Sequence, residues 1–213
     1  MATLPEPPDT LEHPGDDESS PDPAEQWLWR ADALRLSALH YAGRGIPVFP
    51  LAPACPAPPG ARFTHKCPQH DSSCGKTPLT RRGFKDATVN LEQVRAWWLR
   101  TPQANIGTPT GLLFDVIDVD GPEGIASMLE RFTDLNDIGI PLLGRTTTPR
   151  GGGHHLLIAP TGQGNRARLF PGVDYRGEGG YIVLPPSRGG NGRLYRWLTP
   201  FRQITTSGPG DAA

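Results

Sequence analysis

The feature that most constrains the fold is an apolar run at residues 112–120, which reads LLFDVIDVD. It is apolar on both faces of an extended chain and rich in β-branched residues, as is typical of a central strand that is buried on both sides. Side chains two positions apart on a strand point to one face, about 6.6 Å apart. Asp118 and Asp120 are therefore expected to converge where the strand ends. Pro122 suits the first turn of a helix, which we expect to run to about Leu135.

Two carboxylates that point to one spot repel each other unless a cation lies between them. A hard divalent ion with oxygen ligands is the usual solution, and two-metal phosphoryl transfer requires such a site. The Asp-x-Asp pattern alone leaves other interpretations open, because it also occurs in sugar-nucleotide transferases and in surface turns. Asp115 lies on the opposite face of the strand, where a solvated edge or local hydrogen bonds are the expected environment.

A glycine-rich segment, residues 150–155, reads RGGGHH and precedes an apolar strand. Three glycines allow the backbone to approach a ligand closely and leave amides free for phosphate oxygens. Side chains alternate along a strand, so one of His154 and His155 should face the site and the other should not. A flexible hairpin turn with two polar residues is the alternative interpretation.

A third acid, Asp174, lies in residues 173–181, VDYRGEGGY, and is followed by Arg176 and a Gly-rich turn into a strand. A lone Asp in such a segment is more often a turn residue than a ligand. The order of the motifs along the chain favours a ligand here, because an acid pair is followed by a Gly-rich strand with His, then by a single acid and then by a basic residue. We expect Asp174 to complete the shell for two metal ions.

The pattern along the chain predicts an α+β fold, with a mixed or antiparallel central sheet flanked by helices and a Cys/His-rich insert. Residues 1–26 are expected to be a disordered acidic, Pro-rich tail, residues 27–203 a single catalytic domain, and residues 204–213 a flexible end. Helices are expected at residues 27–41 and 91–100, the second with Asn90 as N-cap. Further strands are expected at residues 46–51, 144–147, 155–159, 180–184 and 194–198.

The charge is unevenly distributed along the chain, although the net charge is only -1. Residues 1–26 hold eight acidic side chains and no Lys or Arg. Removing these eight from the 22 acidic residues leaves 14, against 21 Lys and Arg, which is a formal charge of +7. A folded part of that sign favours polyanions such as nucleic acid or triphosphates, but many surfaces of this charge bind neither.

The insert, residues 52–83, is rich in Pro, Cys, His and Gly and is longer than an ordinary connection. Its candidate zinc ligands are Cys55, Cys67, His70 and Cys74, with His65 as a spare. Three thiolates and an imidazole suit tetrahedral zinc, but no Cys-x-x-Cys pair occurs, so unrelated surface thiols remain the alternative.

Three cysteines, no signal peptide and no long apolar segment lead us to expect a cytoplasmic protein that does not enter a membrane.

Nine segments together carry a family resemblance: residues 38–51, 75–79, 83–88, 97–98, 105–107, 116–120, 152–156, 173–174 and 179–187. In this order they resemble the N-terminal primase/polymerase domain of the archaeo-eukaryotic primase superfamily, found in replication proteins of plasmids, phages and integrated elements. The resemblance covers residues 33 to 200.

The resemblance implies roles for the candidate site residues. It places Mg²⁺ or Mn²⁺ on Asp118, Asp120 and Asp174, and the incoming nucleotide on His155. Basic residues beside the matched segments would meet the triphosphate or the template: Lys76, Arg150 and Arg176.

The implied activity is template-dependent nucleotidyl transfer that makes or extends primers in DNA replication, with a DNA template and NTP or dNTP as substrates. The chain has no Walker-type phosphate-binding loop, so a separate helicase would be needed for unwinding. A catalytically inert nucleic-acid-binding replication module is the main alternative, and a sugar-nucleotide transferase is the other.

Overall fold

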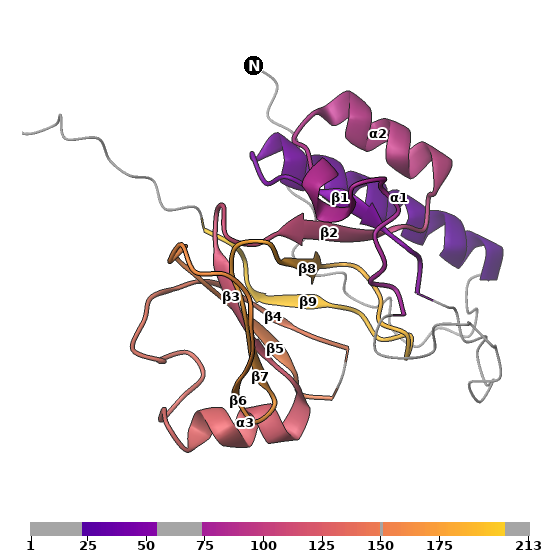
Figure 1. Cartoon of the computed structure of the whole chain (residues 1–213). Helices are drawn as coiled ribbons and strands as arrows, with labels where there is room; N and C mark the ends of the chain where they lie inside the picture. The colour runs from indigo at the N-terminus through magenta and orange to yellow at the C-terminus, as the bar shows by residue number, and fades with distance from the viewer. Residues whose placement is uncertain (1–22, 55–73, 150, 203–213) are drawn as a thin grey trace, which may run out of the picture. The chain divides into compact units, whose positions relative to one another are not determined.

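The chain folds into two compact units, each formed around its own antiparallel sheet (Figure 1). The computed structural model describes residues 23–54, 74–149 and 151–202, with side chains from residue 31 onward. The first unit comprises Met1–Pro109 and Tyr181–Tyr195, and the second comprises Thr110–Gly180 and Arg196–Ala213. Helices and antiparallel strands are mixed without regular alternation, which confirms the predicted α+β class.

The first unit contains a three-stranded sheet in the order β1-β2-β8. Its elements are α1 (Pro23–Gly43), β1 (Phe49–Leu51), the 3-10 helix η1 (Gly83–Asp86), α2 (Leu91–Arg100), β2 (Asn105–Pro109) and β8 (Tyr181–Leu184). Phe49, Val183 and Tyr195 are buried together in its core. The predicted cap of α2 is confirmed, because the Asn90 side chain accepts a hydrogen bond from the Gln93 amide at 3.0 Å.

The second unit contains a six-stranded sheet in the order β6-β7-β3-β5-β4-β9. Its elements are β3 (Asp115–Val119), α3 (Gly121–Leu129), β4 (Leu142–Thr147), β5 (His154–Ile158), β6 (Arg166–Phe170), β7 (Val173–Arg176) and β9 (Arg196–Thr199). One face of the central strands is apolar, where Ile117, Leu156 and Val173 pack with Met128 of α3. Alternation along the strands directs the intervening residues, Asp118 among them, to the other face.

Several elements differ from the sequence prediction. The structure has two sheets where one central sheet was expected, and β2, β6 and β7 were not predicted. The helix after Pro122 ends at Leu129 and does not reach Leu135. Beyond it, the Asp134 carboxylate accepts a hydrogen bond from the Asn136 amide at 3.0 Å, and such local bonds compete with helix formation. Leu135 is still buried, which accounts for the apolar periodicity that extended the prediction.

A close backbone approach fixes α3 against the turn between β6 and β7. A Cβ on Gly124 would lie 2.3 Å from the Gly172 carbonyl oxygen, and Gly172 itself has a left-handed φ of 67°. The same carbonyl accepts a hydrogen bond from the Asp120 amide at 2.7 Å. Only glycine at position 124 permits this contact, which sets where α3 begins and where Asp120 lies.

We therefore expect Gly124→Ala to destabilise the protein by about 1–3 kcal/mol, because the added methyl group would collide with backbone atoms that cannot rotate away. The matched control is Gly151→Ala, whose Cβ would meet no atom within 4 Å. That control should change the free energy of unfolding by no more than about 0.5 kcal/mol. Urea denaturation of the two variants measures the difference, and equal stabilities would show that α3 does not depend on this contact.

Candidate active site

The centre of the candidate site is Asp118 on β3, which lies between two neighbouring strands. In the antiparallel register, Asp118 is directly opposite Asp174 on β7 and directly opposite His155 on β5. Side chains of directly paired residues project from the same face, with Cβ atoms about 4.5–5.5 Å apart. Strand pairing alone therefore places two carboxylates and an imidazole side by side.

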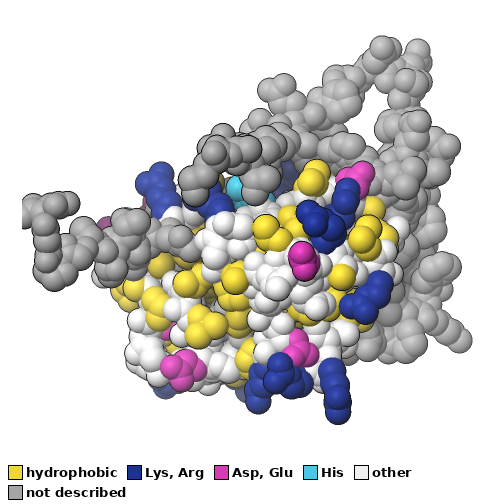
Figure 2. All heavy atoms as spheres, turned by 90° about the horizontal axis from the view of Figure 1, so that it is seen from above, with side chains coloured by type: hydrophobic (Ala, Val, Ile, Leu, Met, Phe, Trp, Pro, Cys, Tyr) yellow, Lys and Arg dark blue, Asp and Glu magenta, His cyan; other side chains and the backbone are white. Residues whose placement is uncertain are grey.

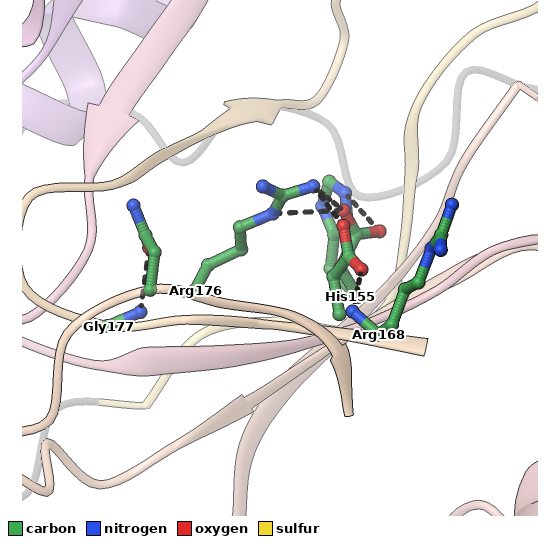
Figure 3. A network of polar contacts seen from close by, with 7 residues as sticks. His155, Arg168, Arg176 and Gly177 are labelled. Carbon is green, nitrogen blue, oxygen red and sulfur yellow. Dashed lines mark hydrogen bonds and ion pairs between the residues drawn. The ribbon is translucent and has the colours of Figure 1, made fainter. Parts of the chain in front are cut away.

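Arg176 joins the two carboxylates. Its Nη2 atom donates to Asp174 Oδ2 at 2.8 Å and to Asp118 Oδ2 at 3.3 Å, and its Nε atom lies 3.4 Å from Asp118 Oδ2 (Figure 3). The two acids share one guanidinium nitrogen, so they lie within a single cluster. The acids are 14% and 23% exposed and Arg176 is 34% exposed, so the arginine is the most accessible member.

Each carboxylate has a second contact on its other oxygen. Asp174 Oδ1 accepts a hydrogen bond from the Arg168 backbone amide at 2.7 Å, and Asp118 Oδ1 lies 3.6 Å from His155 Nε2. Arg168 has a left-handed φ of 55°, where β6 deviates from regular pairing with β7. Sequence reasoning missed Arg168, because its contribution is a main-chain amide in a conformation that no residue type at this position indicates.

The two adjacent histidines point to opposite faces, as the alternation predicted. His155 is almost fully buried beside Asp118, whereas His154 contacts Arg145 and Thr146. Arginine can only donate, so His154 Nε2 accepts from Arg145 Nη2 at 3.2 Å, and Nδ1–H donates to the Thr146 carbonyl at 3.3 Å. Burial and then the neighbouring Arg145 charge lower the pKa of His154, so its neutral form is the stable one.

Asp120 lies immediately after β3, at the N-cap position of α3. Its side chain makes no capping hydrogen bond, and its backbone is held by Gly172 as described above. Because side chains two positions apart on an extended chain point the same way, Asp120 is on the same face as Asp118. Asp120 thus follows Asp118 at the end of the strand, and its side chain does not cap α3.

Asp115 lies on the opposite face of β3. Of the two environments expected for it, hydrogen bonding is confirmed and exposure at a solvated edge is wrong. It is fully buried, and its Oδ2 atom accepts hydrogen bonds from the Tyr175 hydroxyl and the Thr161 amide. Burial, together with the hydrogen bond to Asp115, raises the pKa of Tyr175. This carboxylate has a structural role and is closed off from the candidate site.

The remaining predicted site residues lie elsewhere or outside the described part of the chain. Lys76 belongs to the first unit, where its carbonyl accepts a hydrogen bond from the Tyr181 hydroxyl at 3.0 Å. The described zinc candidate, Cys74, is buried and forms no disulfide. The other positions, Arg150, Cys55, Cys67, His70 and His65, are not described, so the zinc site stays a prediction.

Among the described residues, no group of three or more Cys, His, Asp or Glu side chains is arranged to hold a metal ion. The guanidinium of Arg176 instead donates to one oxygen of each acid. The donor chemistry nevertheless suits a hard cation: two carboxylates directly opposite each other, with a positive group already between them.

A family comparison covers both units. The family model for the bifunctional DNA primase/polymerase N-terminal domain, Prim-Pol, matches residues 38–209. The chain belongs to the Prim-Pol family. No curated protein matches it. Membership indicates a primase/polymerase-type nucleotidyltransferase with DNA and nucleotides as substrates, in a family that typically uses divalent metals. No helix in the described part of this Prim-Pol domain is long and apolar enough to cross a bilayer.

The low pKa of His154 predicts a pH dependence of stability in this Prim-Pol domain. Between the lowered folded pKa and the ordinary histidine pKa of 6.5, the unfolded chain binds the proton more readily than the folded one. The free energy of unfolding should therefore fall as the pH decreases through about 6.5. The contribution of His154 to this pH dependence corresponds to the uptake of at most about one proton on unfolding. Unfolding midpoints measured from pH 7.5 to 5.5 should fall less steeply for His154→Gln. Parallel curves for the two proteins would contradict a neutral, partly buried His154.

Proposed function

We propose that this Prim-Pol domain is a template-dependent nucleotidyltransferase that makes or extends primers, with Asp118, Asp120 and Asp174 as the ligands of two Mg²⁺ or Mn²⁺ ions. The observation that supports this proposal most directly is the pairing of β3 with β7 and β5, which sets Asp174 and His155 beside Asp118. These residues come from three separate chain segments, and the fold gives them a common face.

The reaction is attack of a 3′-hydroxyl oxygen on the α-phosphorus of a nucleoside triphosphate. The new O–P bond forms as the bond to the β-phosphate oxygen breaks, and pyrophosphate leaves. Bound divalent cations would favour the ionised hydroxyl and neutralise charge on the triphosphate. The chain itself provides position and charge, not a covalent intermediate.

The contacts of each residue in the cluster indicate its role in binding metal or nucleotide. Asp118 and Asp174 are held rigidly by neighbouring strands, so their carboxylates are preorganised as ligands. His155 is 6% exposed beside Asp118, and we assign it to the incoming nucleotide. Asp120 follows at the strand end, where the contact between Gly124 and Gly172 fixes its backbone.

An inert nucleic-acid-binding module is the alternative, and one observation favours it: both acids are already paired with Arg176. The two functions differ in product formation. An inert module would bind DNA with a steep salt dependence and yield no oligonucleotide with any metal. A separate helicase remains a prediction from the sequence.

The test is a primer-synthesis and primer-extension assay with labelled ATP and dATP in Mg²⁺ and in Mn²⁺. We expect product from the native chain and at least about a hundredfold less from the double variant Asp118→Ala, Asp120→Ala, because electrostatic stabilisation of the transition state is lost.

The control for this assay is Glu130→Ala, Asp137→Ala, which removes two exposed acids of the same unit and should retain activity. Circular dichroism establishes that both double variants are folded. The catalytic assignment is wrong if the native chain and the Asp118, Asp120 variant give equal product.

A further inference from the structure

Arg176 occupies the oxygens that a metal ion would need. Its Nη2 atom is bonded to Asp118 Oδ2 and to Asp174 Oδ2, the two oxygens that face each other across the paired strands. A divalent ion bridging these acids would require the same lone pairs, so the guanidinium and the ion exclude each other. Coulomb repulsion between two cations at this separation adds to that exclusion.

The Arg176 side chain can leave without any rearrangement of the strand. It is the most exposed member of the cluster, whereas its main chain is fixed by the next residue (Figure 3). The Gly177 amide donates to Asn165 Oδ1 at 3.1 Å, and a Cβ on Gly177 would lie 2.0 Å from the Gln163 carbonyl oxygen. Rotation about the side-chain bonds of Arg176 is therefore the motion that the surroundings leave open.

We propose that Arg176 is an exchange cation. Its guanidinium pairs with Asp118 and Asp174 until divalent metal arrives with a nucleoside triphosphate, and it then moves to the triphosphate. The proposal rests on the proposed function of the same acids. A guanidinium that leaves two carboxylates must find another anion, and its planar fork matches phosphate oxygens. Metal binding and nucleotide binding are coupled in this way through one side chain.

The exchange predicts opposite effects of one substitution on two ligands. In Arg176→Gln, calorimetric titration with Mn²⁺ alone should show affinity about tenfold higher than in the native chain, because no internal cation competes. The affinity for a non-hydrolysable dATP analogue, measured in saturating Mn²⁺, should fall about tenfold because a phosphate contact is lost. A merely structural arginine would weaken both.

Arg168→Gln is the matched control, because Arg168 is an exposed neighbour that contacts Asp174 only through its backbone amide. Both affinities should stay within about twofold of the native values. Arg176→Lys keeps the charge but not the fork, so its Mn²⁺ affinity should lie between those of the native chain and Arg176→Gln. This second variant allows the test if Arg176→Gln does not fold.

The outcomes separate this inference from the proposed function. If Arg176→Gln binds Mn²⁺ no more tightly than the native chain, or keeps its nucleotide affinity, the exchange is refuted. If Asp118→Asn and Asp174→Asn bind Mn²⁺ as tightly as the native chain, the acids are not the metal ligands and the proposed function itself fails.

The first unit carries most of the Lys and Arg residues of the chain. After residue 26 this unit holds 13 Lys and Arg against 4 Asp and Glu, a formal charge of +9, whereas the second unit holds 8 against 10, a formal charge of -2. Figure 2 shows one face of the molecule on which dark blue Lys and Arg side chains stand beside yellow apolar ones. A polyanion would be attracted to the first unit.

The basic turn, defined as residues 79–86, combines cations with aromatic rings. Arg81 and Lys85 are exposed, and neither forms an ion pair with a described residue. Phe84 lies half-buried, stacked on Tyr181 with ring centroids 6.1 Å apart. The Arg82 backbone amide donates to Asp86 Oδ2 at 2.9 Å and the Arg82 side chain pairs with Asp86 Oδ1 at 2.6 Å, and these contacts lower the pKa of Asp86.

We infer that the basic turn binds single-stranded DNA, with Arg81 and Lys85 on phosphates and the edge of the Phe84 and Tyr181 pair available to bases. Single strands are bound by positive surfaces that also offer aromatic rings, whereas duplex binding needs no ring. This inference depends on neither the acids nor a metal, and it goes beyond the proposed catalytic function.

Fluorescence anisotropy with labelled oligo(dT) in EDTA tests it. The double variant Arg81→Gln, Lys85→Gln should bind about tenfold more weakly, and the slope of log affinity against log salt should decrease by about 1.4 for two lost contacts. The control is Arg95→Gln, Arg100→Gln, an equal change of charge at exposed positions of α2 in the same unit, which should stay within about twofold. Equal losses in both variants, or tighter binding of duplex than of oligo(dT) by the native chain, would refute the inference.

Discussion

The candidate site depends on the register in which β3 pairs with β7 on one side and with β5 on the other. In this register Asp118 has Asp174 and His155 as its direct partners. A slip of one residue would turn Asp118 towards the apolar face and bring a buried aliphatic residue in its place. The apolar residues Ile117, Leu156 and Val173 pack with Met128, so hydrophobic burial fixes the register that the polar site requires.

The two faces of β3 show how the same side chain has different chemistry in different surroundings. Asp115 is sealed from solvent, and its Oδ2 atom accepts from two neutral donors, a tyrosine hydroxyl and an amide. Asp118 has a cationic partner that remains one-third exposed. A carboxylate that is sealed from solvent is out of reach of a ligand, whereas a carboxylate paired with a partly exposed cation can exchange its partner.

Much of the second unit was predictable from local patterns. The run at residues 112–120 indicated the central strand, and alternation correctly separated His154 from His155. The strand β7 was readable in principle, since VDYR alternates between the apolar face and the site face, but four residues between turns gave too short a pattern to distinguish from a loop. Nothing local indicated that β7 would pair with β3 and not with another strand, because register is a property of the assembled sheet.

The position of Arg176 was beyond sequence reasoning for a related reason. Its proximity to Asp174 follows from alternation, but its second contact, with Asp118, exists only after strand pairing. The division of charge is similar: the chain as a whole is nearly neutral. Only the boundaries of the two units separate residues 27–109 and 181–195, with a formal charge of +9, from the second unit, with -2. The unit that bears the acid cluster would repel a triphosphate. Phosphate chemistry there needs positive charge, and this unit has no excess of Lys and Arg over Asp and Glu. Arg176 provides one such charge from within the chain, and divalent ions would provide the others. Arginine and metal therefore compete for the same carboxylates, and this competition controls the charge of the cluster.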